Sequence, residues 1–268
     1  MTSLSIRAVL LDIEGTTSSI AFVYDVMFPY VRQHLRDFMQ KNQLRTDVLA
    51  SVDQLAKDAG FEDAQAWQAA HAQPSDSAFE QIKNDQSYVD FVTDHVKALM
   101  DGDSKSTGLK AVQGFIWQAG FESGQLESHL FPDVFPAIER WNRQGISIGI
   151  YSSGSIVAQK LFFGHTPHGD LTPFFERHYD TTIGPKRDLA SYKKIADDFG
   201  FKPNDILFLS DIAAELEAAR AAGLQAIAVV RPGNAALPDS YQGARIESFT
   251  EIAVALQANA QRLMNNPG

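Results

Sequence analysis

The second half of the chain alternates between helix and strand patterns, and this alternation restricts the fold more than any other feature. Beyond Pro132, apolar residues spaced as on one face of a helix alternate with short, continuous apolar runs. We expect helices over residues 134–144, 156–162, 189–199 and 212–222, and strands over 146–151, 178–180, 206–209 and 225–229. Such repetition favours an α/β fold, a doubly wound parallel sheet with helices on both faces.

The first strand of this sheet is separated from the others by a long helical segment. Residues 6–11 form a short apolar run, and from about residue 21 to residue 130 the periodicity is helical. Amphipathic helices are expected over residues 24–40, 46–59, 78–100 and 109–127. The sequence therefore predicts an α/β core of residues 1–20 and 131–268, with an all-helical domain, residues 21–130, inserted between the first and second core strands.

Composition excludes several classes of function. The 268 residues are 44% hydrophobic, enough for a full core, and the net charge of -10 argues against a nucleic-acid or anionic-membrane surface. Without cysteine, a disulfide, a thiol nucleophile and a Cys-ligated metal are excluded, so a metal would be held by oxygen or imidazole ligands. No run approaches the roughly 20 apolar residues of a spanning helix, and the opening run is too short for a signal peptide. We therefore expect a cytoplasmic protein.

Two carboxylates follow the first strand, and they are the first candidate site residues. Asp12 comes directly after the apolar run, Glu14 lies two residues further on, and Gly15 allows the chain to turn sharply. In open α/β sheets, ligands bind outside the carboxyl ends of the strands. An acid after a strand is also commonly a turn residue or a helix N-cap. For Asp12 alone, a turn or N-cap role is the better interpretation. Three further signals in the sequence favour a catalytic role instead.

The second signal follows the strand over residues 146–151. Ser152, Ser153, Gly154 and Ser155 open the next helix, where hydroxyl groups and main-chain N–H groups can bind an anion. Ser153 or Ser155 could equally be an ordinary N-cap.

The third and fourth signals are a lysine and another carboxylate. Lys186 lies just before a predicted helix, and its ammonium group suits a phosphoryl group, although the neighbouring Arg187 could be the functional cation instead. Asp211 lies two residues after the end of the strand over residues 206–209, with Glu215 one helical turn further on. The alternative for Asp211 is again an N-cap.

In this order, the four signals resemble the haloacid dehalogenase superfamily of aspartate-nucleophile phosphohydrolases. More narrowly, residues 11–30, 151–165 and 229–235 are similar to the acireductone synthases, the bifunctional enolase-phosphatases of methionine salvage. Glu14 is the discriminating residue, because most phosphatases of the superfamily have Asp at that position. The resemblance covers nearly the whole chain.

The resemblance implies a role for each carboxylate. Asp12 would attack phosphorus to give an aspartyl-phosphate, and Glu14 would be the acid/base that protonates the leaving oxygen and then activates water. One Mg²⁺ per subunit would be bound by Asp12, Asp211 and the main-chain carbonyl of Glu14.

It further implies that Ser152, Ser153 and Lys186 hold the phosphate of a small phosphorylated substrate. That substrate would be 2,3-diketo-5-methylthiopentyl-1-phosphate, which is enolised at C1 and then dephosphorylated to 1,2-dihydroxy-3-keto-5-methylthiopentene. Glu14 and a residue of the helical domain are both admissible as the enolisation base. The helical domain would be a cap that closes over the substrate. The resemblance favours a monomer, with neither nucleic acid nor membrane as a partner.

Two alternatives stay open at this point. The first is a phosphatase or phosphomutase of the same superfamily that acts on another small phosphate ester. The second belongs to a different class, a non-catalytic protein that binds a phosphorylated metabolite.

Overall fold

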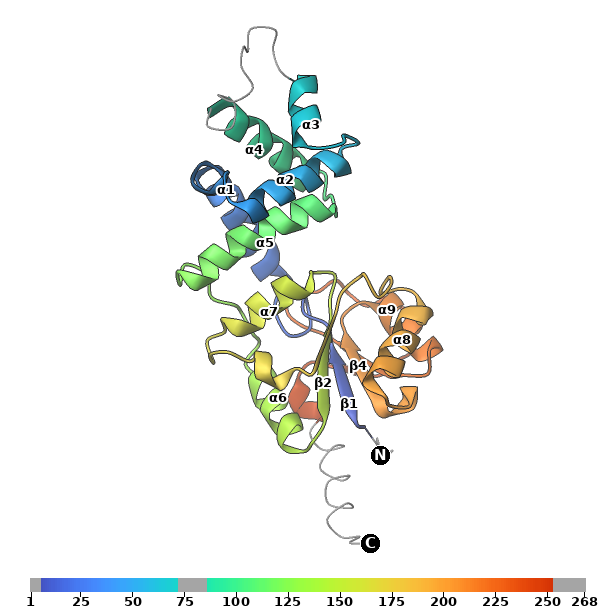
Figure 1. The fold of residues 1–268 in the computed structure, drawn as a ribbon. Helices are drawn as coiled ribbons and strands as arrows, with labels where there is room; N and C mark the ends of the chain where they lie inside the picture. The colour runs from blue at the N-terminus through green and yellow to red at the C-terminus, as the bar shows by residue number, and fades with distance from the viewer. Residues whose placement is uncertain (1–5, 72–85, 253–268) are drawn as a thin grey trace, which may run out of the picture. The chain divides into compact units, whose positions relative to one another are not determined.

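A computed structural model describes residues 6–71 and 86–252 of the chain (Figure 1). The chain divides into two compact units. The α/β unit comprises Met1–Tyr24 and Glu127–Gly268, and the helical unit comprises Asp25–Leu126.

The α/β unit is built on a parallel sheet, as the sequence predicts. Among the described residues the sheet has six strands in the order β3-β2-β1-β4-β5-β6, and every neighbouring pair is parallel. The strands are β1 Ala8–Leu11, β2 Ser147–Tyr151, β3 Arg177–Tyr179, β4 Ile206–Ser210, β5 Gln225–Val229 and β6 Arg245–Ile246. The short β6 was not predicted. The first strand of the chain therefore lies inside the sheet, between β2 and β4.

Helices cover both faces of this sheet. They are α6 Val134–Arg143, α7 Ile156–Gly164, α8 Leu189–Phe199 and α9 Ala213–Ala221. Short 3-10 segments occur at Thr172–Phe174, Pro203–Asp205 and Phe249–Ile252. Figure 1 shows α6 and α7 on one side of the sheet and α8 and α9 on the other. The doubly wound architecture is thus confirmed.

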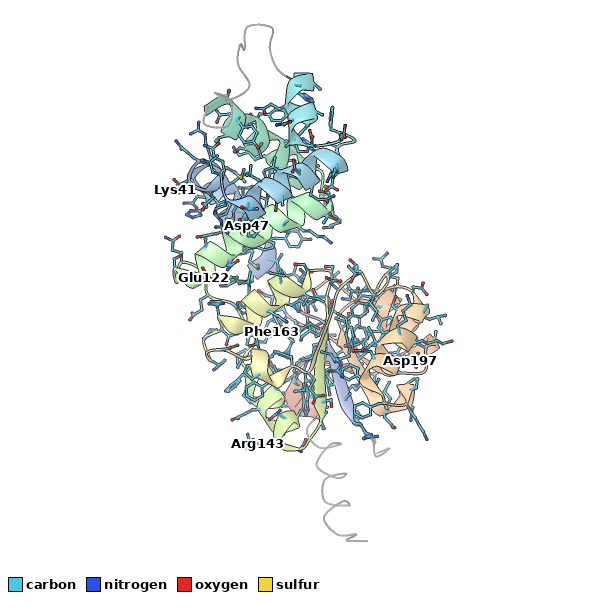
Figure 2. All side chains as sticks on the ribbon, in the orientation of Figure 1. Lys41, Asp47, Glu122, Arg143, Phe163 and Asp197 are labelled. Carbon is cyan, nitrogen blue, oxygen red and sulfur yellow. The ribbon has the colours of Figure 1, made fainter. Side chains whose placement is uncertain are left out.

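Alternation along the strands supplies each face of the sheet with apolar side chains. Ala8 and Leu10 of β1 belong to one buried cluster with Phe208 of β4 and Tyr192 of α8. Neighbouring side chains of a strand point to opposite faces, so Val9 and Leu11, which are also fully buried, face the other layer. In Figure 2, the labelled Phe163 lies within the α/β unit, whereas Arg143 and Asp197 lie at its surface.

The helical unit contains five α-helices among the described residues. They are α1 Phe28–Asn42, α2 Thr46–Asp58, α3 Ala64–His71, α4 Gln86–Asp101 and α5 Thr107–Glu122. A π-helical segment, η1 Phe22–Met27, leads into α1. The sequence predicted neither this π segment nor α3. Part of the helix predicted over residues 78–100 lies outside the described residues, and the helix predicted to reach residue 127 ends at Glu122.

The helices of this unit pack through regularly spaced apolar residues. Val31, Leu35 and Met39 repeat every four residues along α1, and all three are fully buried. Helices α2 and α5 approach very closely at Gly108, where a Cβ atom would lie 2.5 Å from the main-chain nitrogen of Leu55. In the part of the chain that the structure describes, no helix is both long enough and apolar enough to cross a membrane.

Candidate active site

Three predicted site residues directly follow three neighbouring strands. Asp12 follows β1, Ser152 follows β2 and Asp211 follows β4. The register aligns the strand ends, because Leu11 is opposite both Ile150 of β2 and Leu209 of β4. The topology therefore brings these residues to one edge of the sheet, where open α/β sheets bind ligands.

A buried ion-pair cluster lies at this edge. The Lys186 ammonium is 2.7 Å from Asp12 Oδ1 and 2.8 Å from Glu215 Oε2. The hydroxyl of Ser210 lies 3.0 Å from Glu215 Oε2 and 3.4 Å from Asp12 Oδ2. Lys186 is only 9% exposed and Asp12 only 4% exposed, so the lysine is not a solvated surface cation. Burial opposes the charge on Lys186, but attraction by Asp12 and Glu215 raises its pKa above the usual value, and it stays an ammonium ion.

Asp211 lies beside this cluster, and among the described residues it has no ion pair of its own. Burial and the neighbouring Asp12 carboxylate raise the pKa of Asp211 to about 7. Helix α9 begins after Ile212 without a side-chain cap, so the structure does not support the alternative in which Asp211 is an N-cap. A Cβ atom on Gly15 would lie 2.4 Å from Asp211 Oδ2, and Gly15 has φ +72°. Glycine is therefore required at this turn both by conformation and by space.

The loop that carries Glu14 folds tightly back on the end of β1. The main-chain N–H groups of Thr17 and Ser18 both donate to the carbonyl of Ile13, at 2.9 Å each. Glu14 forms a β-bridge with Ser18 and is half-buried. Its carboxylate is not one of the two that pair with Lys186, since these belong to Asp12 and Glu215.

The serine-rich turn after β2 divides its residues between two roles. Ser152 is buried, and its hydroxyl accepts a hydrogen bond from the Gly154 N–H at 3.1 Å. Ser155 is the N-cap of α7 and accepts from the Ala158 N–H at 3.3 Å. Ser153 is exposed. Of the two candidate caps, Ser155 therefore has that structural role, and Ser153 stays a candidate ligand for phosphate.

Three hydroxyl groups hold the main chain around Lys186. Tyr151 donates to the carbonyl of Gly184 at 2.8 Å, Ser191 to that of Pro185 at 2.8 Å, and Tyr192 to that of Lys186 itself at 2.6 Å. The lysine is thereby fixed through its backbone as well as through its two ion pairs. Sequence reasoning did not assign a role to these hydroxyls.

Glu215 and Ser210 are also absent from the predicted set of site residues. Glu215 lies four residues after Asp211, one turn into α9, and this spacing was a signal for a second carboxylate at the same strand end. Burial and repulsion by Asp12 raise the pKa of Glu215 above its usual value, despite the ion pair with Lys186.

The residues present fit a hydrated divalent cation. Among the described residues, no group of three His, Asp or Glu side chains could hold a metal ion alone. Asp12 and Asp211 instead offer two carboxylates, and a loop that turns at Gly15 can add a main-chain oxygen. With Glu215, three clustered carboxylates face the single ammonium of Lys186, so the cluster carries excess negative charge. Oxygen donors and excess negative charge are what Mg²⁺ requires.

A second buried ion pair, between Arg231 and Asp133, supports the Glu14 loop. The Arg231 guanidinium binds both oxygens of Asp133, at 3.0 and 2.9 Å, and its Nε donates to the carbonyl of Thr16 at 3.1 Å. It also lies over the rings of Phe131 and Phe249, 4.5 and 4.9 Å from their centroids. Arg231 is therefore a rigid support for this loop.

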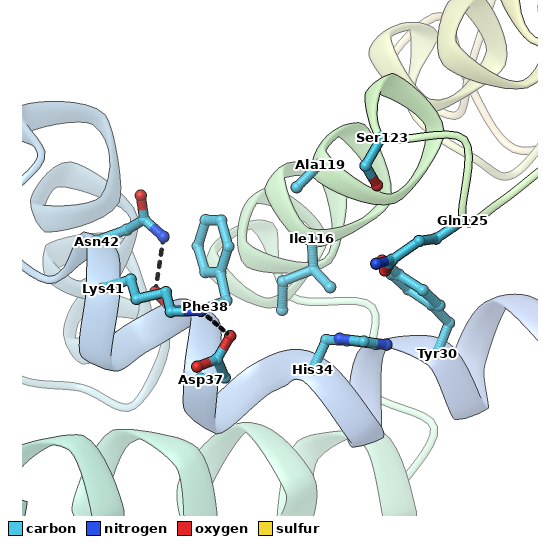
Figure 3. A pocket seen from close by; sticks show the side chains of 10 residues that line it. All are labelled: Tyr30, His34, Asp37, Phe38, Lys41, Asn42, Ile116, Ala119, Ser123 and Gln125. Atoms are coloured by element: carbon cyan, nitrogen blue, oxygen red, sulfur yellow. Dashed lines mark hydrogen bonds and ion pairs between the residues drawn. The ribbon is translucent and has the colours of Figure 1, made fainter.

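The helical unit has a pocket of its own, with a volume of about 240 Å³, between α1 and α5 (Figure 3). Its polar groups pair largely with one another. Tyr30 donates to Gln125 Oε1 at 2.8 Å, and Lys41 lies 2.8 Å from Asp37. None of the predicted site residues lines this pocket.

Comparison with known proteins agrees with this fold. Residues 6–223 match the family model of haloacid dehalogenase-like hydrolases. The parallel sheet, with aspartates after two adjacent strands and a buried lysine paired with the first of them, is consistent with that family. The chain is thus a haloacid dehalogenase-like hydrolase.

Its relatives define the family within that class. The chain is 41% identical to enolase-phosphatase E1 of Pseudomonas fluorescens, over 92% of this chain and 100% of that protein. It is 42% identical to enolase-phosphatase E1 of Drosophila willistoni, over 93% and 97% of the two chains. The crystal structure of the UTR4 protein from Saccharomyces cerevisiae matches with a TM-score of 0.70 and 29% identity, over 91% of this chain and 98% of that one. The chain belongs to the enolase-phosphatase E1 family.

Proposed function

We propose that the protein is a Mg²⁺-dependent bifunctional enolase-phosphatase. It converts 2,3-diketo-5-methylthiopentyl-1-phosphate into 1,2-dihydroxy-3-keto-5-methylthiopentene and phosphate, a reaction of methionine salvage. The observation that carries this proposal is the juxtaposition of Asp12 and Asp211, at the ends of β1 and β4, with the buried Lys186, in a chain of the enolase-phosphatase family.

The phosphatase reaction proceeds in two displacements. An Asp12 oxygen attacks phosphorus, the bond from phosphorus to the ester oxygen breaks, and Glu14 gives its proton to that leaving oxygen. The Glu14 carboxylate then takes a proton from water, whose oxygen attacks phosphorus and releases Asp12 and inorganic phosphate. Asp12, Asp211 and the main-chain carbonyl of Glu14 would hold Mg²⁺, which would supply positive charge to offset the repulsion between an anionic nucleophile and an anionic phosphate.

Lys186 prepares the nucleophile and the phosphate site together. Its contact with Asp12 Oδ1 fixes the carboxylate while the hydroxyl bonds around residues 184–186 fix the lysine. Ser152 and Ser153 bind the remaining phosphate oxygens at the start of α7, where main-chain N–H groups point outward. These fixed charges and dipoles stabilise charge on the transferring phosphoryl group without reorganisation during the reaction.

The enolase reaction removes a C1 proton before the phosphate is lost. Glu14 is a candidate for the base, and a residue of the helical unit is the other candidate. We propose further that the helical unit is a cap that excludes water from the reacting substrate. Specificity for the diketone is then a property of this unit, and the chemistry of phosphate transfer is a property of the α/β unit.

The proposal is tested by incubating the purified protein and the diketo phosphate with Mg²⁺ or with EDTA. Phosphate release and the ultraviolet absorbance of the enediol are followed together, and Asp12→Asn is the inactive control. We expect both products to form only with Mg²⁺. Rapid phosphate release from simple sugar phosphates, with none from the diketone, would assign the protein to another substrate. Binding of the diketo phosphate without turnover would indicate a non-catalytic binding protein.

A further inference from the structure

The segment Val229–Ala235, which begins at the last residue of β5, has no role in the mechanism described so far. It nevertheless contacts the loop after the nucleophile twice. Arg231 donates to the carbonyl of Thr16, and Asn234 Nδ2 donates to the carbonyl of Gly15 at 2.9 Å. Two consecutive carbonyl groups of the Glu14 loop are thus held by side chains from this one segment.

The orientation of the Asn234 amide is fixed by its neighbours. Its Nδ2 also lies 3.3 Å from the carbonyl oxygen of Val229. Only the NH₂ side of an amide can satisfy two carbonyl oxygens, so Oδ1 must point the other way. That oxygen is buried, and none of the described residues donates a hydrogen bond to it.

The unpartnered oxygen lies on the Asp211 side of Gly15. The position that a Cβ of residue 15 would occupy is 3.0 Å from Asn234 Oδ1 and 2.4 Å from Asp211 Oδ2. The two oxygens therefore lie within about 5.4 Å of each other, a separation that a single water molecule can bridge. A buried acceptor without a donor is costly, and water carried by a cation at Asp211 would supply that donor.

We propose that Asn234 is a positioning residue for the cation site, fixing the Gly15 turn through Nδ2 and accepting a hydrogen bond from cation-bound water through Oδ1. The inference rests on the proposed Mg²⁺ site. The Val229–Ala235 segment would then contribute to metal binding although none of its residues is a direct ligand of the metal. Hydrogen bonds of this outer kind orient a bound metal and its water, and their loss weakens metal affinity.

The test measures Mg²⁺ binding to the full chain by isothermal titration calorimetry, with magnesium chloride alone. Asn234→Ala removes both halves of the interaction, and we expect its dissociation constant for Mg²⁺ to rise on the order of 10-fold. Asn234→Asp keeps an acceptor on the Asp211 side but loses the donor to Gly15. We expect this variant to bind Mg²⁺ more tightly than Asn234→Ala, because it keeps the acceptor, although its melting temperature falls like that of Asn234→Ala.

The control is Asn42→Ala in the helical unit, where Asn42 Nδ2 also donates to a main-chain carbonyl, that of Phe38, at 2.8 Å. It should leave Mg²⁺ affinity unchanged. Unchanged affinity in Asn234→Ala, or an equal loss in Asn234→Ala and Asn234→Asp, would show a purely structural asparagine and overturn the inference.

Because no substrate is used, failure of the proposed function gives a different result. A wild type that binds Mg²⁺ but does not turn over the diketo phosphate would leave the inference standing. A wild type that does not bind Mg²⁺ would overturn the inference and the metal-dependent mechanism together.

Discussion

The geometry of the ion pair between Asp133 and Arg231 predicts how much stability the protein loses when the pair is broken. Four donors converge on Asp133: two guanidinium N–H groups of Arg231, the Ser248 hydroxyl and the Phe249 N–H. The side chains of Arg231 and Asp133 are only 4% and 12% exposed. Asp133→Asn removes the negative charge and leaves the guanidinium buried without a counter-ion. Breaking a buried pair in this way costs about 3–5 kcal/mol of unfolding free energy.

Helix α6, which begins directly after Asp133, provides a matched control. Glu139 pairs with Arg143 at 2.9 Å on the exposed side of α6, with side chains 44% and 69% exposed. Glu139→Gln should cost no more than about 1 kcal/mol, because exposed pairs are solvated and screened. Unfolding by urea at pH 7, followed by circular dichroism, measures both variants against the wild type.

The pH dependence gives a second, independent result. Burial opposes the charge on Asp133, but the hydrogen bonds from Arg231 and Phe249 hold its pKa below the usual value. A lowered pKa in the folded state contributes stability that is present above the ordinary aspartate pKa and is lost as the pH falls below about 4. The difference in unfolding free energy between wild type and Asp133→Asn should therefore become smaller from pH 5 to pH 3. Equal costs for the two variants, or a gap independent of pH, would refute the reasoning.

Three further substitutions test the site itself. Glu14→Asp shortens the proposed acid/base by one methylene and should lower kcat more than it weakens Mg²⁺ binding; an unchanged kcat would count against the role of Glu14. Gly15→Ala forces a Cβ against Asp211 at a positive φ, so Mg²⁺ affinity measured by calorimetry should fall, with a loss of stability of about 1–3 kcal/mol. Lys186→Met leaves Asp12 and Glu215 buried without their cation, which should abolish turnover and cost about 3–5 kcal/mol of unfolding free energy at pH 8. The cost should be smaller at pH 5, because the raised pKa of Glu215 allows its carboxylate to take up a proton. A stable, active variant would contradict the assigned pairing.

The α/β elements were predictable because local and tertiary signals agree. Helix α8 spans the predicted residues 189–199, since Asp188 caps its first turn by accepting from the Ala190 N–H and Gly200 ends it at φ +71°. Strand β5 likewise has its predicted bounds, 225–229. The strands of the parallel sheet are buried between two helical layers, and their sequences are therefore largely continuous apolar runs.

The helical unit was less predictable because contacts between its helices, rather than local sequence patterns, determine some of its elements. Helix α3 has Trp67 as its one buried residue, and that ring packs on Phe91 and His95 from α4. Eight residues with a single apolar anchor give no amphipathic period. Helix α5 ends before its predicted boundary, where the chain turns at Gly124 with φ +71°.

The candidate active site was likewise predictable only in part. That Asp12, Ser152 and Asp211 share one sheet edge follows from their positions after strands. The pairing of Lys186 with both Asp12 and Glu215, and the support of the Glu14 loop by Arg231, join residues far apart in the sequence. No local pattern encodes such contacts, and the catalytic roles of these residues stay predictions until they are measured.

The central claim is that Asp12 carries the phosphoryl group, and rapid acid quench during turnover tests it most directly. The protein is mixed with Mg²⁺ and the diketo phosphate, quenched within the first turnover, digested and examined by mass spectrometry. The account predicts one added phosphoryl group on the peptide that contains Asp12, and none in Asp12→Asn. Phosphate release at full rate by Asp12→Asn, or a phosphoryl group trapped on another residue, would contradict it.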